Sequence, residues 1–260
     1  MSTRSASSSC SWSGSRRSGD RLRAVTLRDV RLRALLILAA LVCVPSAVSA
    51  SGSPTQLLTS ILAAARAEHS VHYVSSASLG NSHVSQLGDA GATQGIQRIT
   101  FRTAGKTGHV AVIFVAKSAY LRGDAFTLVD YMGFNAGAAA AYAGRWILVP
   151  HSDGAYSTIA AGLTFSSVIG ELELSAPLTR VPDTTIGGRR VIGVKGKSST
   201  APGSIAATLY ARAAGPPLPV REVATAGKTR AVVTFSRWNE AVHVAVPASA
   251  VPISKVRKHP

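Results

Sequence analysis

The stretch GIQRITFRTAGKTGHVAVIFV, residues 95–115, carries the pattern that decides the fold. Its two halves, Gly95–Thr103 and His109–Val115, are rich in β-branched and aromatic residues, and in the first half apolar residues alternate with polar ones. The segment TAGKT lies between them, and its glycine and polar residues are typical of a tight turn. The stretch therefore predicts a β-hairpin, and a second TAGKT, at Thr225–Thr229, stands between strand-like runs in the same way.

Runs of the same kind extend in both directions from this hairpin and are separated by short links of glycine, asparagine, serine and proline. Such links between alternating runs favour an antiparallel meander. We expect about ten or eleven strands in all. The further candidate strands are Val71–Leu79, His83–Asp89, Ala119–Arg122, Arg145–Val149, Leu178–Thr185, Arg189–Lys195, Ser204–Ala211, Pro219–Thr225 and Thr229–Trp238. A final apolar run, Val242–Val246, stops at Pro247.

Helical spacing of apolar residues is found in three places. Ser53 is a good N-cap and precedes a proline, so we expect a helix over Pro54–Glu68. Two central helices are expected over Asp124–Ala143, capped by Asp124 and broken near Gly133 or Gly137, and over Tyr156–Leu174. Strands in a meander with few helices predict the α+β class with an antiparallel sheet.

The N-terminal fifty residues have the composition of an export signal. Residues 1–33 are rich in serine and arginine, and we expect them to be disordered; Ala34–Val44 is an uncharged apolar run. A small-x-small site ends at Ala50, so residues 34–50 predict a secretory signal cleaved after Ala50. An uncleaved anchor is the alternative. Cys43 is a further alternative as a lipidation site, but the bulky Val42 stands where a lipoprotein signal has a small residue.

The rest of the chain is expected to form one domain over residues 51–247, followed by a basic tail over 248–260. Eight of the 28 basic and two of the 12 acidic residues precede residue 51, so the remainder carries about +10. That charge suits contact with anionic lipid head groups at a membrane surface or with cell-wall polymers. Because the cations are scattered and the chain is exported, we expect no nucleic-acid partner. We expect a monomer outside the cytoplasm, secreted or associated with the envelope.

Motifs for catalysis, metals and cofactors do not emerge from the sequence. A phosphate-binding loop needs a glycine five positions before the Gly-Lys pair, but Thr100 and Glu222 stand there in the two TAGKT copies. The seven histidines form no HExxH pattern, residues from Ser51 onward lack cysteine, and there is no Gly-x-Ser-x-Gly elbow. We therefore expect no enzyme activity, no cofactor and no metal site.

Several stretches, taken in order and spacing, resemble one family of exported proteins. They are Ser118–Asp124, Gly144–Ile147, Gly187–Val194, Ala207–Tyr210, Leu218–Pro219 and Phe235–Asn239. Together they resemble the LppX/LprA/LprF/LprG-type lipoproteins of actinobacteria over most of residues 56–247. The resemblance implies a half-open, strongly curved antiparallel sheet of the LolA type, with helices on its concave side. The clear lipobox of that family is missing around Cys43.

The resemblance also implies a function, namely binding of the acyl chains of a lipid or glycolipid in an apolar cavity for transport or chaperoning. Apolar residues on the central helices and on a facing strand are the candidates for the cavity lining. They are Phe114, Phe126, Met132, Phe134, Phe165 and Ile169. The alternative is an envelope scaffold of the same fold that binds no lipid, in which these residues are ordinary core.

Overall fold

The computed structural model describes residues 52–198 and 205–259. The expected disordered leader over 1–33, the signal segment over 34–50 and Cys43 lie outside the described residues. Within the described ranges, no helix has the length and apolar character needed to cross a bilayer.

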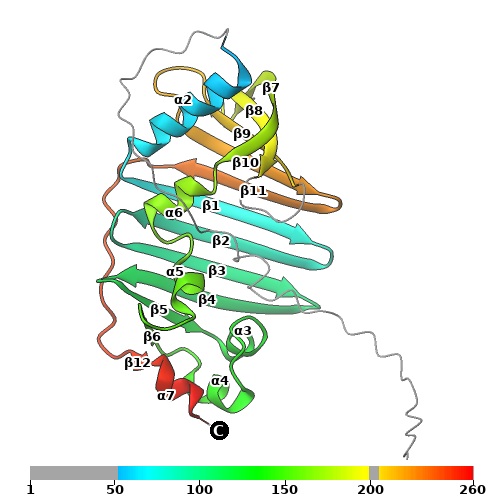
Figure 1. The fold of residues 1–260 in the computed structure, drawn as a ribbon. Coiled ribbons are helices and arrows are strands. Elements are labelled where there is room, and N and C mark those ends of the chain that lie inside the picture. The colour runs from blue at the N-terminus through cyan, green and yellow to red at the C-terminus, as the bar shows by residue number, and fades with distance from the viewer. Residues whose placement is uncertain (1–51, 199–204, 260) are drawn as a thin grey trace, which may run out of the picture.

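Twelve strands form one sheet in the order β12-β6-β5-β4-β3-β2-β1-β11-β10-β9-β8-β7. All neighbours are antiparallel except β12 and β6, which run parallel. The sheet is curved and open, as predicted, with slightly more strands than predicted (Figure 1). The bounds are β1 Ser70–Leu79, β2 Ser82–Gly91, β3 Gly95–Thr103, β4 Lys106–Val115, β5 Ser118–Gly123, β6 Ile147–Pro150, β7 Leu174–Ile186, β8 Arg189–Ser198, β9 Ala206–Arg212, β10 Pro219–Ala226, β11 Thr229–Ser236 and β12 Val251–Pro252.

Both TAGKT copies are hairpin turns, as predicted. In the first, Thr103 pairs with Lys106, and Ala104 and Gly105 adopt positive φ values of 47° and 76°. This pair of left-handed residues matches the right-handed twist of the flanking strands. The second copy joins β10 to β11 through Gly227, whose φ is 58°.

The helices are shorter and more numerous than predicted. Helix α2, Pro54–Arg66, begins as expected with a capping box: the Ser53 hydroxyl accepts from the Gln56 amide nitrogen at 3.2 Å, and the Gln56 side chain accepts from the Ser53 nitrogen at 2.9 Å. The break expected in the first central helix is present, because the link that contains Gly133 is not helical. The second central helix is divided as well, so four short helices occupy the two predicted stretches. The four are α3 Ala125–Asp130, α4 Ala136–Tyr142, α5 Tyr156–Ala160 and α6 Phe165–Gly170.

The C-terminal part also differs from the prediction. The final apolar run, Val242–Val246, is irregular. The fold does not end at Pro247, since β12 extends the sheet beside β6 and helix α7, Ile253–Arg257, follows it. Val251, Ile253 and Val256 are buried in the core, so most of the expected basic tail is part of the domain.

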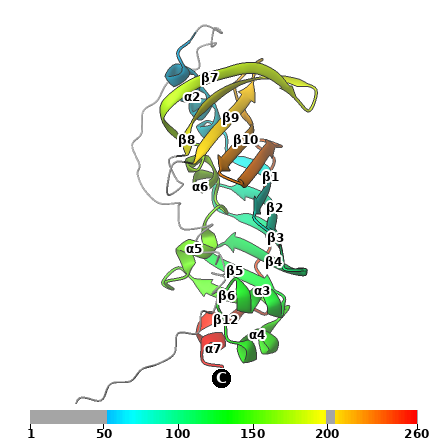
Figure 2. The same cartoon turned by 90° about the vertical axis from the view of Figure 1, so that its right-hand side faces the viewer.

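Two meanders meet where β1 pairs with β11, residues about 160 positions apart in the chain. Helices α2, α5 and α6 lie along one face of the sheet (Figure 2). Two apolar clusters fill this concave face. The lower cluster joins β3–β6 and β12 to α3, α4, α5 and α7, and the upper cluster joins α2 and α6 to β1, β8, β9 and β11.

Candidate functional site

Between the two clusters, small apolar side chains of the concave face are only half-buried and lie beside the polar Ser75 and Gln86. We call this region the floor, and it consists of Ala77, Val84, Ala224, Ala231 and Val233. The strand register makes the floor continuous, because Ala77 on β1 pairs with both Ala231 on β11 and Val84 on β2, and Ala224 on β10 pairs with Ala231. These side chains are small, so the floor forms a shallow depression between bulkier clusters on either side.

A pair of acidic residues stands at one side of the floor. Glu222 and Glu171 border a hollow of about 160 Å³ together with Ser198 and floor residues of β10 and β11. Burial, followed by the negative charge of Glu171, raises the pKa of Glu222 to about 7. Desolvation also raises the pKa of Glu171 to about 7, although the residue as a whole is exposed. A carboxyl with a pKa of about 7 is protonated below neutral pH and about half protonated at pH 7, and its protonated form can donate a hydrogen bond to a ligand oxygen.

A buried polar group lies between the two clusters. The Tyr73 hydroxyl donates to the Gly162 carbonyl at 2.8 Å and accepts from the Gln97 side-chain nitrogen at 2.7 Å. Gln97 is 2% exposed, and its Oε1 atom has no hydrogen-bond partner. Close by, Gly95 faces the Leu163 carbonyl so tightly that a methyl group there would lie 1.9 Å from the oxygen. These contacts fix the α5–α6 link against the sheet and bound the floor.

The six predicted lining residues are divided between the clusters rather than gathered around one cavity. Phe114, Met132 and Phe134 pack at the edge of the lower cluster, and Phe126 lies edge-on to Tyr131 in the same region. The other two, Phe165 and Ile169, are buried in the upper cluster. None of the six borders the hollow beside Glu222. Their contact with a ligand stays a prediction.

The sequence reasoning missed the floor and the acidic pair. A half-buried alanine gives no signal in a single sequence, since alternation alone does not tell which strands become neighbours. Glu222 carried a detectable signal: its side chain occupies a position that alternation assigns to the apolar face of β10.

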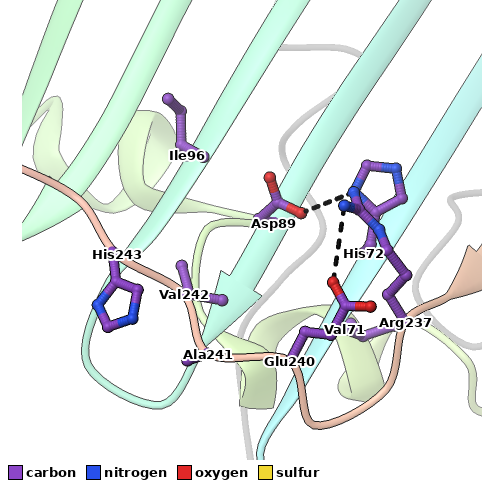
Figure 3. A pocket seen from close by; sticks show the side chains of 9 residues that line it. All are labelled: Val71, His72, Asp89, Ile96, Arg237, Glu240, Ala241, Val242 and His243. Carbon is purple, nitrogen blue, oxygen red and sulfur yellow. Dashed lines mark hydrogen bonds and ion pairs between the residues drawn. The ribbon is translucent and has the colours of Figure 1, made fainter.

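A second hollow, of about 270 Å³, lies where the chain leaves β11 and crosses the ends of β1–β3 (Figure 3). The His72 and Asp89 side chains are 2.6 Å apart, and Arg237 lies 3.4 Å from Asp89 and 3.6 Å from Glu240. The contact of Arg237 with Asp89 holds the crossing segment to the sheet. Across the described ranges, no group of histidine, cysteine and acidic residues has the arrangement of a metal site.

Comparison with known proteins identifies the architecture. LprF from Mycobacterium bovis matches with a TM-score of 0.51 and 19% identity, over 76% of this chain and 100% of LprF. The chain has the fold of LprF. Lipoprotein LppX from Mycobacterium tuberculosis matches at a TM-score of 0.47 and 16% identity, over 74% of this chain and 99% of LppX. A LolA superfamily protein from Nitrosomonas europaea matches with a TM-score of 0.27 and 6% identity. The match covers 75% of this chain and 96% of the Nitrosomonas protein.

The LprF-like fold confirms the expected half-open sheet with helices on its concave side. No family model and no curated protein matches the sequence. The likeness therefore rests on architecture, and function has to be argued from the floor and its surroundings.

Proposed function

We propose that the protein binds the acyl chain of a lipid or glycolipid along the floor, outside the cytoplasm, and that it is a carrier and not an enzyme. One observation carries the proposal: a continuous strip of alanine and valine stays half-exposed on the concave face, between two clusters of buried apolar residues. Each methylene of a ligand that leaves water at this strip contributes about 0.8 kcal/mol.

The acidic pair gives the ligand an orientation. A protonated Glu222 beside the floor donates a hydrogen bond to an ester or hydroxyl oxygen, so the polar end of the lipid lies near β10. The acyl chain then extends over Ala231 and Ala77 toward β2. The aromatic and methionine side chains predicted at the lower cluster would flank its far end.

The scaffold alternative has an observation of its own. The hollow beside the floor, at about 160 Å³, is smaller than the roughly 300–1,000 Å³ of typical ligand pockets. Lipid binding therefore requires that the ligand lie along an open trough or that the two clusters separate. A protein that only serves as a scaffold would keep the floor free of lipid.

Native mass spectrometry of protein purified from its own envelope tests the proposal. We expect a bound lipid that dissociates on denaturation. The variant Ala77→Trp places a bulky ring on the floor and should abolish the adduct, whereas Ser76→Trp places the same ring on the opposite face of β1 and should retain it. If the wild-type protein carries no lipid, the scaffold alternative is favoured. Equal lipid loading of both variants would show that the ligand lies elsewhere.

A further inference from the structure

The convex face of the sheet combines exposed arginines with exposed apolar side chains. Register aligns five residues across β1–β5 on this face: Val74, Leu87, Arg98, Ala111 and Arg122, which we call the outer row. Val74 is 46% exposed and Leu87 38% exposed, and both arginines are exposed. The helices α2, α5 and α6 lie on the other side of the sheet (Figure 2).

Three arginines of this face form no ion pair with an acidic residue among the described residues. Arg98 and Arg122 are two strands apart, about 10 Å, and Arg102 lies four residues along β3 from Arg98, about 13 Å. At such spacing the three exposed charges repel one another only weakly, and together they form a positive patch that can attract an external anion.

The acids closest in the strand register are already engaged. Asp89 contacts His72 and Arg237. Asp124 caps α3 by accepting from the Thr127 nitrogen at 2.7 Å, and it also accepts from the His109 nitrogen at 2.6 Å. Neither acid forms an ion pair with Arg98, Arg102 or Arg122.

Aromatic and aliphatic side chains accompany the charge. The Arg122 guanidinium lies 4.8 Å from the centre of the Trp146 ring, at the β6 end of the outer row. Tryptophan and arginine are side chains that settle at the boundary between head groups and acyl chains. Exposed Val74 and Leu87 gain from contact with acyl chains but gain little from a soluble polyanion.

We propose that the outer row, with Arg102 and Trp146, docks the protein on the surface of an anionic phospholipid bilayer. The arginines bind lipid phosphates, and the side chains of Val74 and Leu87 insert into the head-group region. Docking by this face leaves the floor turned away from the bilayer, so the two surfaces can be occupied at the same time. The inference goes beyond lipid carriage and does not depend on it.

Flotation of the exported protein with phosphatidylglycerol–phosphatidylcholine vesicles, compared with pure phosphatidylcholine vesicles, tests this proposal. Each arginine near an anionic surface strengthens binding by about fivefold. The triple variant Arg98→Gln, Arg102→Gln and Arg122→Gln should therefore bind the anionic vesicles roughly 100-fold more weakly than wild type. A matched control removes three exposed cations at distant turns. It combines Lys117→Gln, Arg189→Gln and Lys228→Gln, and it should bind nearly as well as wild type.

Three results would overturn the proposal. They are wild-type protein that fails to float with anionic vesicles, an equal loss in both triple variants, and binding to soluble polyphosphate as tight as binding to vesicles. The last would indicate a polymer partner. The double variant Val74→Ser and Leu87→Ser should reduce vesicle binding and leave polyphosphate binding unchanged. Delipidated protein should float like loaded protein, which separates this test from that of lipid carriage.

Discussion

Replacing Glu222 by glutamine should stabilise the protein at alkaline pH. Glu222 is only 9% exposed, lies in register with Val233 and Leu209, and has its pKa raised to about 7 from an ordinary value of 4.5. In the unfolded chain, the carboxyl ionises near 4.5. Between these two values the folded protein holds a proton that the unfolded chain releases, so folding stability falls as pH rises through this window.

The size of the stability change follows from the difference between the pKa of Glu222 in the folded protein and in the unfolded chain. Raising the pKa from 4.5 to about 7 lowers the free energy of unfolding by roughly 3 kcal/mol above pH 7, and this loss is relieved near pH 5. The pKa of Glu171 shifts in the same direction, but screening by solvent at this exposed residue reduces its share. For a domain of this size, 3 kcal/mol corresponds to a change in Tm of roughly 6–12 °C.

Urea unfolding and thermal melts at pH 5.5 and 8 provide the assay. Wild type should be less stable at pH 8 than at pH 5.5, and Glu222→Gln should lose most of that dependence. Glu173→Gln is the control, since Glu173 is exposed and paired with Arg66 at 2.6 Å. The reasoning is refuted if Glu222→Gln melts no higher than wild type at pH 8, or if it keeps the wild-type slope with pH.

Two further substitutions test the link that bounds the floor. Gly95→Ala places a methyl group against the Leu163 carbonyl and should destabilise the protein by roughly 3 kcal/mol in thermal melts. In the control Gly154→Ala, the added methyl meets no atom within 4 Å, so stability should change by less than about 0.5 kcal/mol. Equal melting temperatures of the two variants would contradict the close approach of Gly95 to Leu163. Tyr73→Phe leaves the buried Gln97 amide without its partner and should lower the free energy of unfolding in urea by about 2 kcal/mol. Adding Gln97→Leu should restore part of this loss in the double variant. If the losses of the two single variants simply add, Tyr73 and Gln97 are not coupled.

The strands could be predicted from sequence because their signals are local. Alternation along β3 and β4, and the glycine turn at Gly105, fix a hairpin without reference to the rest of the chain. The helix starts were equally local, as the Asp124 cap of α3 shows. The break at Gly133 could likewise be predicted from its glycine. The link between α5 and α6 could not be predicted, because it depends on long-range contacts such as the hydrogen bond from Tyr73 to Gly162.

The prediction of a basic tail at the C-terminus is wrong for a different reason. Lys255, Arg257 and Lys258 dominate its composition, so it was interpreted as a basic tail. Ile253 and Val256, three residues apart, carry the signal of a buried helical face, and Val251 precedes them in a strand. A stretch this short has little statistical weight, and its burial depends on β6, which lies about 100 residues earlier.

The floor could not be predicted because it arises from a long-range pairing. Only when β1 lies beside β11 do Ala77 and Ala231 become neighbours, and nothing near either residue specifies that pairing. The same register sends Arg98 and Arg122 to the other face, since successive side chains of a strand point to opposite sides. One alternation thus produces both an apolar surface for an acyl chain and a basic surface for head groups. A slip of one residue between β1 and β11 would exchange the two faces of half the sheet, so both proposed functions depend on the packing that fixes this register.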